Sequence, residues 1–334
     1  MNWAVWQQHR KQFMALGILL VLFTAFMIPT GLHFWRIYQQ ALTGCHIANT
    51  CSQLSNELFT WPLDSDLFHF VQLSVLAVPF LLGLFCGVPL VAKEYADGTN
   101  RFVWTQSVSR RKWLSIKLVW TIIAAAVYAG IFAALATWWF RASNALYHNR
   151  FSYLAFDSQG IAPIAYAVFA VAVGIAVGTW RKRILSAFAI TLGILLAVQI
   201  SVSLFVRPHY ATPRISTAPI VDAGPPPSPA TGVWISDSEQ TNNKGQSLDW
   251  ANPPKQCLVA DPNAPSSKNL HSGSVNGGPA TDFDCLTSLG YHWIVRYQPS
   301  YRYWDFQRIE TGLYLGLTVI PIAATYWLVL RRDA

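Results

Sequence analysis

Six long apolar stretches constrain this chain more than any other feature of its sequence. They lie at residues 13–32, 70–92, 114–140, 161–179, 184–206 and 311–330. Each has about 20 residues, which is enough for a helix to cross a hydrocarbon core of about 30 Å. Only 12% of the 334 residues are charged, whereas soluble domains average about 25%. The sequence therefore predicts an all-α membrane protein with six spanning helices.

The basic residues predict the orientation of these spans. If the N-terminus is cytoplasmic, thirteen basic and three acidic residues lie in the cytoplasmic segments, and the remainder carries a net charge of −2 within a total of +8. The positive-inside rule then places both termini in the cytoplasm of a bacterial cell, with the chain crossing the inner membrane. Because topology explains the basic residues, they do not indicate a nucleic-acid partner.

The segments between the spans divide the chain into three parts: spans one to five at 1–206, an extracellular insert at 207–310, and span six with a tail at 311–334. The first part should open with a short interfacial helix that carries Trp3 and Trp6 beside basic residues. Residues 180–183 should close a tight hairpin between spans four and five. The insert contains Pro225-Pro226-Pro227 and much Ser, Asn and Gly, which predicts irregular structure. Its segment 291–297 should form a strand or lie on the membrane.

Four of the five cysteines fall in the predicted outside segments. Cys45 and Cys51 share the first segment, and Cys257 and Cys285 share the last. Pairs in an oxidising compartment favour two disulfides, although four free thiols remain the alternative. No C-x-x-C or H-x-x-x-H spacing accompanies them, so we expect no metal site.

The predicted spans contain almost no ionisable residue. Ion-coupled pumps need buried Asp, Glu, His or Lys, and an intramembrane hydrolase needs a nucleophile and a base together. No G-x-x-x-x-G-K-[ST] motif is present either. The chain should therefore not be an enzyme, should bind no cofactor itself, and should take energy from another subunit.

The loop between spans two and three is the best candidate for that energy input. Span two should continue as a helix through Lys93 and Glu94. Gly98 suits a left-handed C-cap, and Thr99 can then N-cap a short helix across the cytoplasmic face. Ser109 should mark a turn before span three begins at the basic residues 110–112.

This loop resembles the coupling helix of permease subunits in type-2 ATP-binding-cassette exporters. The shared pattern is E-x-x-x-G-T, then T-x-S-x-S-R and a basic residue entering the next span. The opening W-x-V-W-x-Q-H-R and the late Y-Q-P-S-Y-R-Y-W-D-F-Q-R-I-E-T-G-L-Y resemble permeases of high-GC Gram-positive and related soil bacteria.

The resemblance implies a partner ATPase that holds ATP and Mg, a second permease subunit (a copy or a related chain) and surrounding lipid. It places the following residues at the ATPase interface: Glu94, Tyr95, Gly98, Thr99, Arg101 and Arg110. For Glu94 the alternative is an ordinary pair with Lys93 or with lipid, and for Arg110 a purely topological role. The implied function is export of an amphipathic or lipophilic compound such as a drug, a membrane-active peptide or a lipid.

The segment before span six is open to two interpretations. Arg302, Trp304, Gln307 and Glu310 could form an outer gate or a substrate rim, or only an aromatic belt with a local Arg–Glu pair. Two other functions compete with export. One is a membrane-anchored sensor or binding protein that uses the insert, and the other is an enzyme of lipid metabolism.

Overall fold

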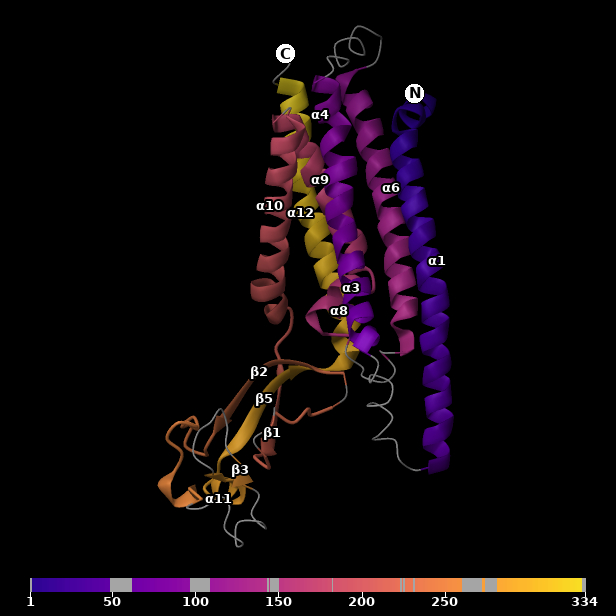
Figure 1. The fold of residues 1–334 in the computed structure, drawn as a ribbon. Helices are drawn as coiled ribbons and strands as arrows, with labels where there is room; N and C mark the ends of the chain where they lie inside the picture. Colours follow the sequence, from indigo (N-terminus) through magenta and orange to yellow (C-terminus); the bar gives the residue numbers. More distant parts are fainter. Residues whose placement is uncertain are drawn as a thin grey trace. The chain divides into compact units, whose positions relative to one another are not determined.

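The computed structural model describes residues 2–48, 62–96, 109–142, 144, 150–181, 183–222, 224, 226–230, 232–259, 272–273 and 281–331. They form two compact units (Figure 1). The helical unit comprises Met1–Tyr210 and Tyr303–Ala334, and the β unit comprises Ala211–Arg302.

The helical unit is a bundle of long helices. Its elements are α1 (Asn2–Ala48), α3 (Pro62–Leu82), η1 (Gly83–Gly87), α4 (Val88–Ala96), α6 (Arg110–Trp139), α8 (Tyr153–Ser158), α9 (Ala162–Arg181), α10 (Ile184–Ser201), η2 (Val202–Val206), η3 (Arg207–His209) and α12 (Tyr303–Arg331). Six helices among the described residues are long and apolar enough to span a membrane. They extend over Met14–Gln40, Leu67–Lys93, Arg110–Trp139, Ala162–Arg181, Ile184–His209 and Ser300–Arg331.

Several local predictions are confirmed. Helix α4 continues through Lys93 to Ala96, and α6 begins at Arg110 after an N-cap in which Ser109 Oγ accepts from the Lys112 amide at 3.4 Å. Helices α9 and α10 form the expected tight hairpin. The residues of the predicted interfacial helix at the N-terminus are helical and continue without a break into the first span, because α1 extends from Asn2 to Ala48.

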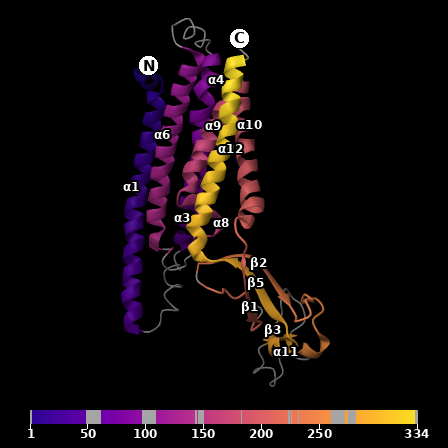
Figure 2. The same cartoon turned by 180° about the vertical axis from the view of Figure 1, so that it is seen from behind.

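Helix α9 is the centre of the bundle. It contacts α3, α4, α6, α10 and α12, and most of its length is buried (Figures 1 and 2). Its sequence is rich in Ala, Gly and Val, which lets neighbouring backbones approach closely. Helix α1 packs mainly on α6, at the edge of the bundle, and its large side chains such as Ile18, Val21 and Leu22 are exposed. An apolar surface of this kind suits contact with lipid.

The closest approach in the bundle joins α9 to the π-helical turn η1. A Cβ on Gly87 would lie 2.7 Å from the carbonyl oxygen of Val171, and a Cβ on Gly174 would clash with the carbonyl oxygen of Gly83. Side chains at these positions would therefore force the two backbones apart. Single-turn π-helices inside α-helices often mark functional positions.

We expect Gly174→Ala to lower the free energy of unfolding by about 1–3 kcal/mol, because an extra methyl group in a tight contact forces backbone shifts. Gly316→Ala on α12 is the matched control, since a Cβ there meets no atom within 4 Å. Denaturation of both variants in detergent micelles tests this. Equal stability of the two would contradict the close contact.

The β unit departs from the irregular structure predicted for the insert. Strands β1 (Arg214–Pro219), β5 (His292–Gln298) and β2 (Trp234–Thr241) form an antiparallel sheet in the order β1-β5-β2. Beside it lie η4 (Lys255–Cys257), the short β3 (Ser272–Gly273) and β4 (Thr281–Asp282), α11 (Phe283–Ser288) and η6 (Ser300–Arg302). Segment 291–297 is thus mainly a central strand. The all-α expectation failed here because β1 and β2 are short and largely polar.

The predicted disulfide between Cys257 and Cys285 is present, and it joins η4 to α11. Cys257 packs with Ile220, Phe283 and Leu286 in a small apolar core. A bridge between residues 28 positions apart restricts the unfolded chain and so stabilises such a small core. Cys51 lies outside the described residues, as does the side chain of Cys45, so their bridge stays a prediction.

Candidate functional site

Three charged side chains meet inside the helical unit. One of them comes from α8, which lies at the end of the unit away from the start of α1 and the end of α12 (Figure 1). Asp157 lies in α8, Arg207 opens η3, and Glu310 lies in the third turn of α12. They are 1%, 4% and 0% exposed. Charged residues are almost never fully buried unless they are paired, so this charge cluster is the strongest functional candidate among the described residues.

Arg207 binds both carboxylates of the charge cluster. Its Nε lies 2.9 Å from Glu310 Oε2 and its Nη2 lies 2.7 Å from Glu310 Oε1, which is a bidentate pair. The same Nη2 also donates to Asp157 Oδ1. The guanidinium carbon lies 4.3 Å from the centre of the Phe156 ring. One arginine therefore ties three separate segments of the chain together through strong, charge-assisted bonds.

The other partners of the two carboxylates are also donors. The Tyr166 hydroxyl lies 2.5 Å from Glu310 Oε1 and 3.2 Å from Asp157 Oδ1, and its single proton is shared between these two oxygens. Tyr210 donates to Glu310 Oε2 at 3.2 Å, and Gln199 Nε2 donates to Asp157 Oδ2 at 3.0 Å. A protonated carboxyl group would need an acceptor in place of one donor. With both carboxylates ionised, the two carboxylates and one guanidinium carry a net charge of −1.

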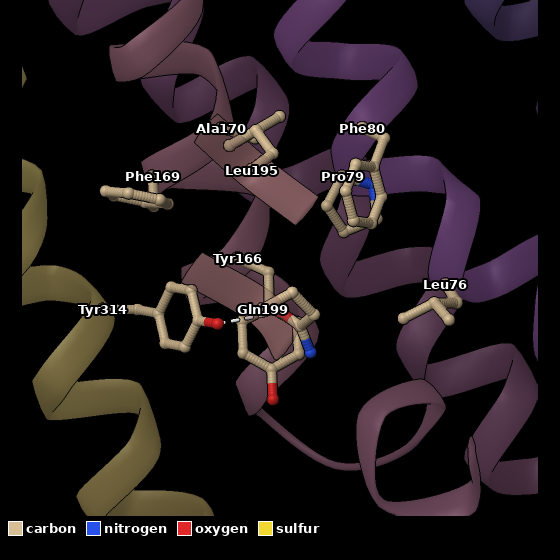
Figure 3. Close-up of a pocket in the computed structure, with 9 residues that line it drawn as sticks. All are labelled: Leu76, Pro79, Phe80, Tyr166, Phe169, Ala170, Leu195, Gln199 and Tyr314. Atoms are coloured by element: carbon tan, nitrogen blue, oxygen red, sulfur yellow. Dashed lines mark hydrogen bonds between the residues drawn. The ribbon is translucent and has the colours of Figure 1, made fainter. Parts of the chain in front are cut away.

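A narrow cavity adjoins the charge cluster (Figure 3). Its lining is mostly apolar and aromatic: Leu76, Pro79, Phe80, Tyr166, Phe169, Ala170, Leu195, Gln199 and Tyr314. The Tyr314 hydroxyl donates to Gln199 Oε1 at 2.8 Å. Tyr166 and Gln199 thus belong both to the wall of this aromatic pocket and to the shell of donors around the carboxylates. About 10 Å³ is free for the centre of a water molecule, which is room for about one water.

Gln307 organises the backbone beside the charge cluster. Its Oε1 accepts from the amides of Ile161 and Ala162 at 3.0 and 2.8 Å, and its Nε2 donates to the carbonyl of Phe156 at 3.0 Å. These two amides open α9, where a helix leaves its first N–H groups without partners inside the helix. Gln307 therefore caps α9 from α12 and fixes α8, which carries Asp157.

The family comparison decides which class of membrane protein this is. Residues 17–207 match the family model described as ABC-2 membrane transporter related, and this segment is more than half of the chain. The chain belongs to this family. No curated protein and no solved structure matches it. The six candidate spans agree with a multi-pass permease, and membership implies association with an ATP-binding-cassette ATPase.

The coupling-loop residues of this permease lie mostly beyond the described part of the chain. Gly98, Thr99 and Arg101 are outside it. The backbones of Glu94 and Tyr95 lie in the last turn of α4, although their side chains are not among those described, and Arg110 is the first residue of α6. Their role at an ATPase interface stays a prediction.

The predicted rim before span six does not form one site in the permease. Gln307 and Glu310 are buried, whereas Trp304 is 44% exposed. Arg302 belongs to the β unit, where its Nη1 donates to the carbonyl of Thr212 and to Gln298 Oε1, both at 2.8 Å. The predicted local Arg–Glu pair is also wrong. Glu310 binds Arg207, which is distant in sequence, and Arg308 pairs with Asp305 at 3.4 Å.

The expectation that the spans contain almost no ionisable residue overlooks Arg207 and Glu310. The predicted spans end at 206 and begin at 311, whereas the helices that could span the membrane include Arg207 and Glu310. The spacing of Gln199, Ser203 and Arg207 by four residues places all three on one helical face, which is a signal that the sequence does carry. Asp157 gave no comparable signal, because it stands in a short aromatic segment between spans.

Proposed function

We propose that the chain is the transmembrane subunit of an ATP-driven exporter, in which it forms the path for an amphipathic or lipophilic compound. Its energy comes from a separate ATPase subunit that holds ATP and Mg, and the complex lies in a bacterial cell membrane. The observation that carries this proposal is the family match over residues 17–207, which includes five of the six candidate spans and the whole segment between α4 and α6.

The end of α4 supports an ATPase contact at this segment. Glu94 lies in the last turn of α4, which ends at Ala96. Backbone carbonyls give that end of a helix a partial negative charge, so a carboxylate there is locally unfavourable. A basic group on a partner would offset this cost. Because α4 ends and α6 begins at the end of the unit where α1 begins and α12 ends, the proposed coupling surface lies on the side of both termini (Figures 1 and 2).

The exposed apolar surface supports contact with lipid and with a second permease subunit. Besides the side chains of α1, large apolar residues are exposed on α10, such as Leu185, Leu196 and Leu204 in its continuation η2. Two such halves, either copies or related chains, would enclose the transport path between them. The apolar composition of the six candidate spans favours a lipophilic or amphipathic compound over a hydrophilic one.

We expect Glu94→Arg to abolish co-purification with the cognate ATPase, or the coupled ATP hydrolysis of the reconstituted complex. The positive charge that replaces the carboxylate at position 94 would repel the basic group on the partner that this contact requires. Asp305→Arg is the matched control, since Asp305 is 59% exposed and lies on α12, far from α4 along the bundle. Wild-type association and hydrolysis with Glu94→Arg would refute this role of Glu94.

A second candidate function uses the β unit as a receptor. Residues Ala211–Arg302 form a compact unit with its own sheet, disulfide and apolar core, as a ligand-binding domain on a membrane anchor would. Six spans exceed what an anchor needs. Co-purification distinguishes the two functions, because an ATPase partner supports the exporter and a kinase partner supports the sensor.

A further inference from the structure

We propose that Asp157 is a proton-binding site, and that proton uptake there rotates the amide of Gln199 and changes the polar wall of the aromatic pocket through Tyr314. This proposal rests on the geometry of the charge cluster and not on the contact with an ATPase. Failure of the coupling experiment would therefore leave it standing, and its own failure would leave the exporter proposal standing.

The first argument is the uncompensated charge of the cluster. Two buried carboxylates face one guanidinium, and the neighbouring donors Tyr166, Tyr210 and Gln199 are uncharged. Burying a net charge away from water is costly, and a protein reduces that cost by binding a proton or a counterion. The cluster therefore favours the uptake of one positive charge.

The arrangement of donors selects a proton over a metal ion or an organic cation. Both oxygens of Glu310 accept two hydrogen bonds each, and Asp157 Oδ1 accepts two as well. Asp157 Oδ2 accepts a single bond, from Gln199 Nε2. A cation that needs several free oxygens finds none among these described contacts, and the pocket holds about one water. A proton needs neither several free oxygens nor a large cavity. It can bind at Asp157 Oδ2, which accepts only one hydrogen bond.

Rotation of the Gln199 amide completes the hydrogen bonds of the protonated state. A proton from bulk water forms an O–H bond at Asp157 Oδ2, and the net charge of the cluster changes from −1 to zero. The amide then turns by half a rotation, so that Oε1 accepts from the new hydroxyl and Nε2 donates to Tyr314 Oη. The Tyr314 hydroxyl, which donates to Gln199 Oε1 in the ionised state, is released and can donate to a water molecule in the pocket.

The groups around Asp157 shift its pKa in opposite directions. Burial raises the pKa of Asp157, Arg207 on η3 lowers it, and Glu310 on α12 raises it. Together with the hydrogen bonds from Arg207 and Gln199, which lower it, these effects bring the pKa to about 6. Tyr166 on α9, Tyr210 after η3 and Tyr303 and Tyr314 on α12 also face the cluster. Arg207 binds Glu310 through two nitrogens and Asp157 through one, so Asp157 has the weaker counter-charge. The proton therefore binds at Asp157 in mildly acidic conditions.

Infrared difference spectroscopy of the purified full-length chain in lipid nanodiscs tests the site directly. Acidification from about pH 8 to about pH 4.5 should produce the carbonyl band of a buried protonated carboxyl group with a midpoint near pH 6. Labelling aspartate carboxyl groups with ¹³C should shift this band, and labelling glutamate should not. Both labels leave the protein unmutated, so the result does not depend on the folding of a variant. Absence of the band, or a shift only with labelled glutamate, overturns the proposal.

Two variants should move the midpoint in opposite directions. Gln199→Leu removes the charge-assisted bond to the ionised form and leaves the site more apolar, so the midpoint should rise by about one pH unit or more. Glu310→Gln removes the neighbouring negative charge, so the midpoint should fall by a similar amount. Asp305→Asn on the exposed side of α12 should leave it unchanged. An unchanged midpoint in Gln199→Leu would show that Gln199 does not act on the proton of Asp157, and it would refute the relay through its amide.

Thermal stability provides an independent readout of the same proton. The unfolded chain has an Asp pKa of about 3.9, so the folded protein binds the proton more tightly. This contribution to stability is complete below about pH 4 and is lost as the pH rises through about 6. Wild-type protein should therefore gain melting temperature between pH 7.5 and pH 5 relative to Asp157→Asn. Parallel melting curves for both proteins across this range would contradict proton uptake at Asp157.

Discussion

Replacing Arg207 with Met is expected to lower the free energy of unfolding of the permease by about 3–5 kcal/mol. The substitution leaves Asp157 and Glu310 buried, close to one another through the shared Tyr166 hydroxyl, and without a counter-charge. It also frees η3 from both α8 and α12. Chemical denaturation in detergent micelles, followed by circular dichroism and by size-exclusion chromatography, measures the loss.

Two controls separate loss of the charge balance from loss of packing. Arg308→Met changes an arginine that is 72% exposed and one helical position beyond Gln307, so it should cost no more than about 0.5 kcal/mol. The triple variant Arg207→Met, Asp157→Asn, Glu310→Gln removes all three charges. It should regain much of the lost stability, because an uncharged cluster no longer buries an unpaired ion. If Arg207→Met alone were as stable as wild type, the ion pairs of Arg207 with Asp157 and Glu310 would not stabilise the fold.

The second large effect is expected for Gln307→Leu, which should cost about 2–5 kcal/mol. The leucine leaves the amides of Ile161 and Ala162 and the carbonyl of Phe156 buried without their partner. Each unsatisfied buried polar group costs about 1–3 kcal/mol. Because these groups open α9, the central helix of the bundle, the loss should appear in global unfolding, measured by denaturation in micelles.

Gly160→Ala tests the packing of Gln307 against the segment that precedes α9. Gly160 has a φ of +77°, a conformation that residues with a Cβ rarely adopt, and a Cβ there would lie 2.7 Å from Gln307 Oε1. The variant should therefore also be destabilised, whereas Trp304→Leu, at an exposed position of α12, should change stability little. Wild-type stability of both Gln307→Leu and Gly160→Ala would show that this cap does not hold α9.

The sequence predicts the bundle well because hydrophobic length is a local property. Each apolar stretch appears as a helix, and boundaries marked by local chemistry, such as Ser109 before Arg110, are correct to the residue. The β unit is less predictable. Its sheet depends on β5 pairing with β1 and with β2, segments far away in the chain whose own composition is largely polar.

The charge cluster could be predicted only in part. Glu310 and Gln307 are recognisable as polar residues at the start of a span, and Arg207 stands at the end of another. Their partnership depends on the packing of α8, η3 and α12, which no local pattern encodes. The predicted boundary at 206 lies one residue before Arg207, and the predicted boundary at 311 lies one residue after Glu310, so both residues were left outside the predicted spans. Charged residues at the edges of apolar stretches are therefore candidates for burial as well as for the headgroup region.

We propose the charge cluster as a second determinant of transport, beside the proposed coupling loop. One end of the permease holds the proposed contact with the ATPase, and the other end of the same bundle is tied by Arg207. Helix α9 connects them, because it packs on α4 through close glycine contacts and carries Tyr166 at its opposite end. We therefore expect a displacement of α4 to reach the charge cluster through α9.

Cross-linking of the assembled complex tests the central claim, that a separate ATPase acts on the loop between α4 and α6. Membranes that contain Thr99→Cys permease and the cognate ATPase would be treated with a thiol-to-amine cross-linker. Trp304→Cys, at the start of α12, is the control and would be treated in the same way. Our account predicts that Thr99→Cys yields a permease–ATPase adduct whose amount changes with ATP, and that Trp304→Cys yields none. An adduct from Trp304→Cys but not from Thr99→Cys, or no adduct from either, would contradict it.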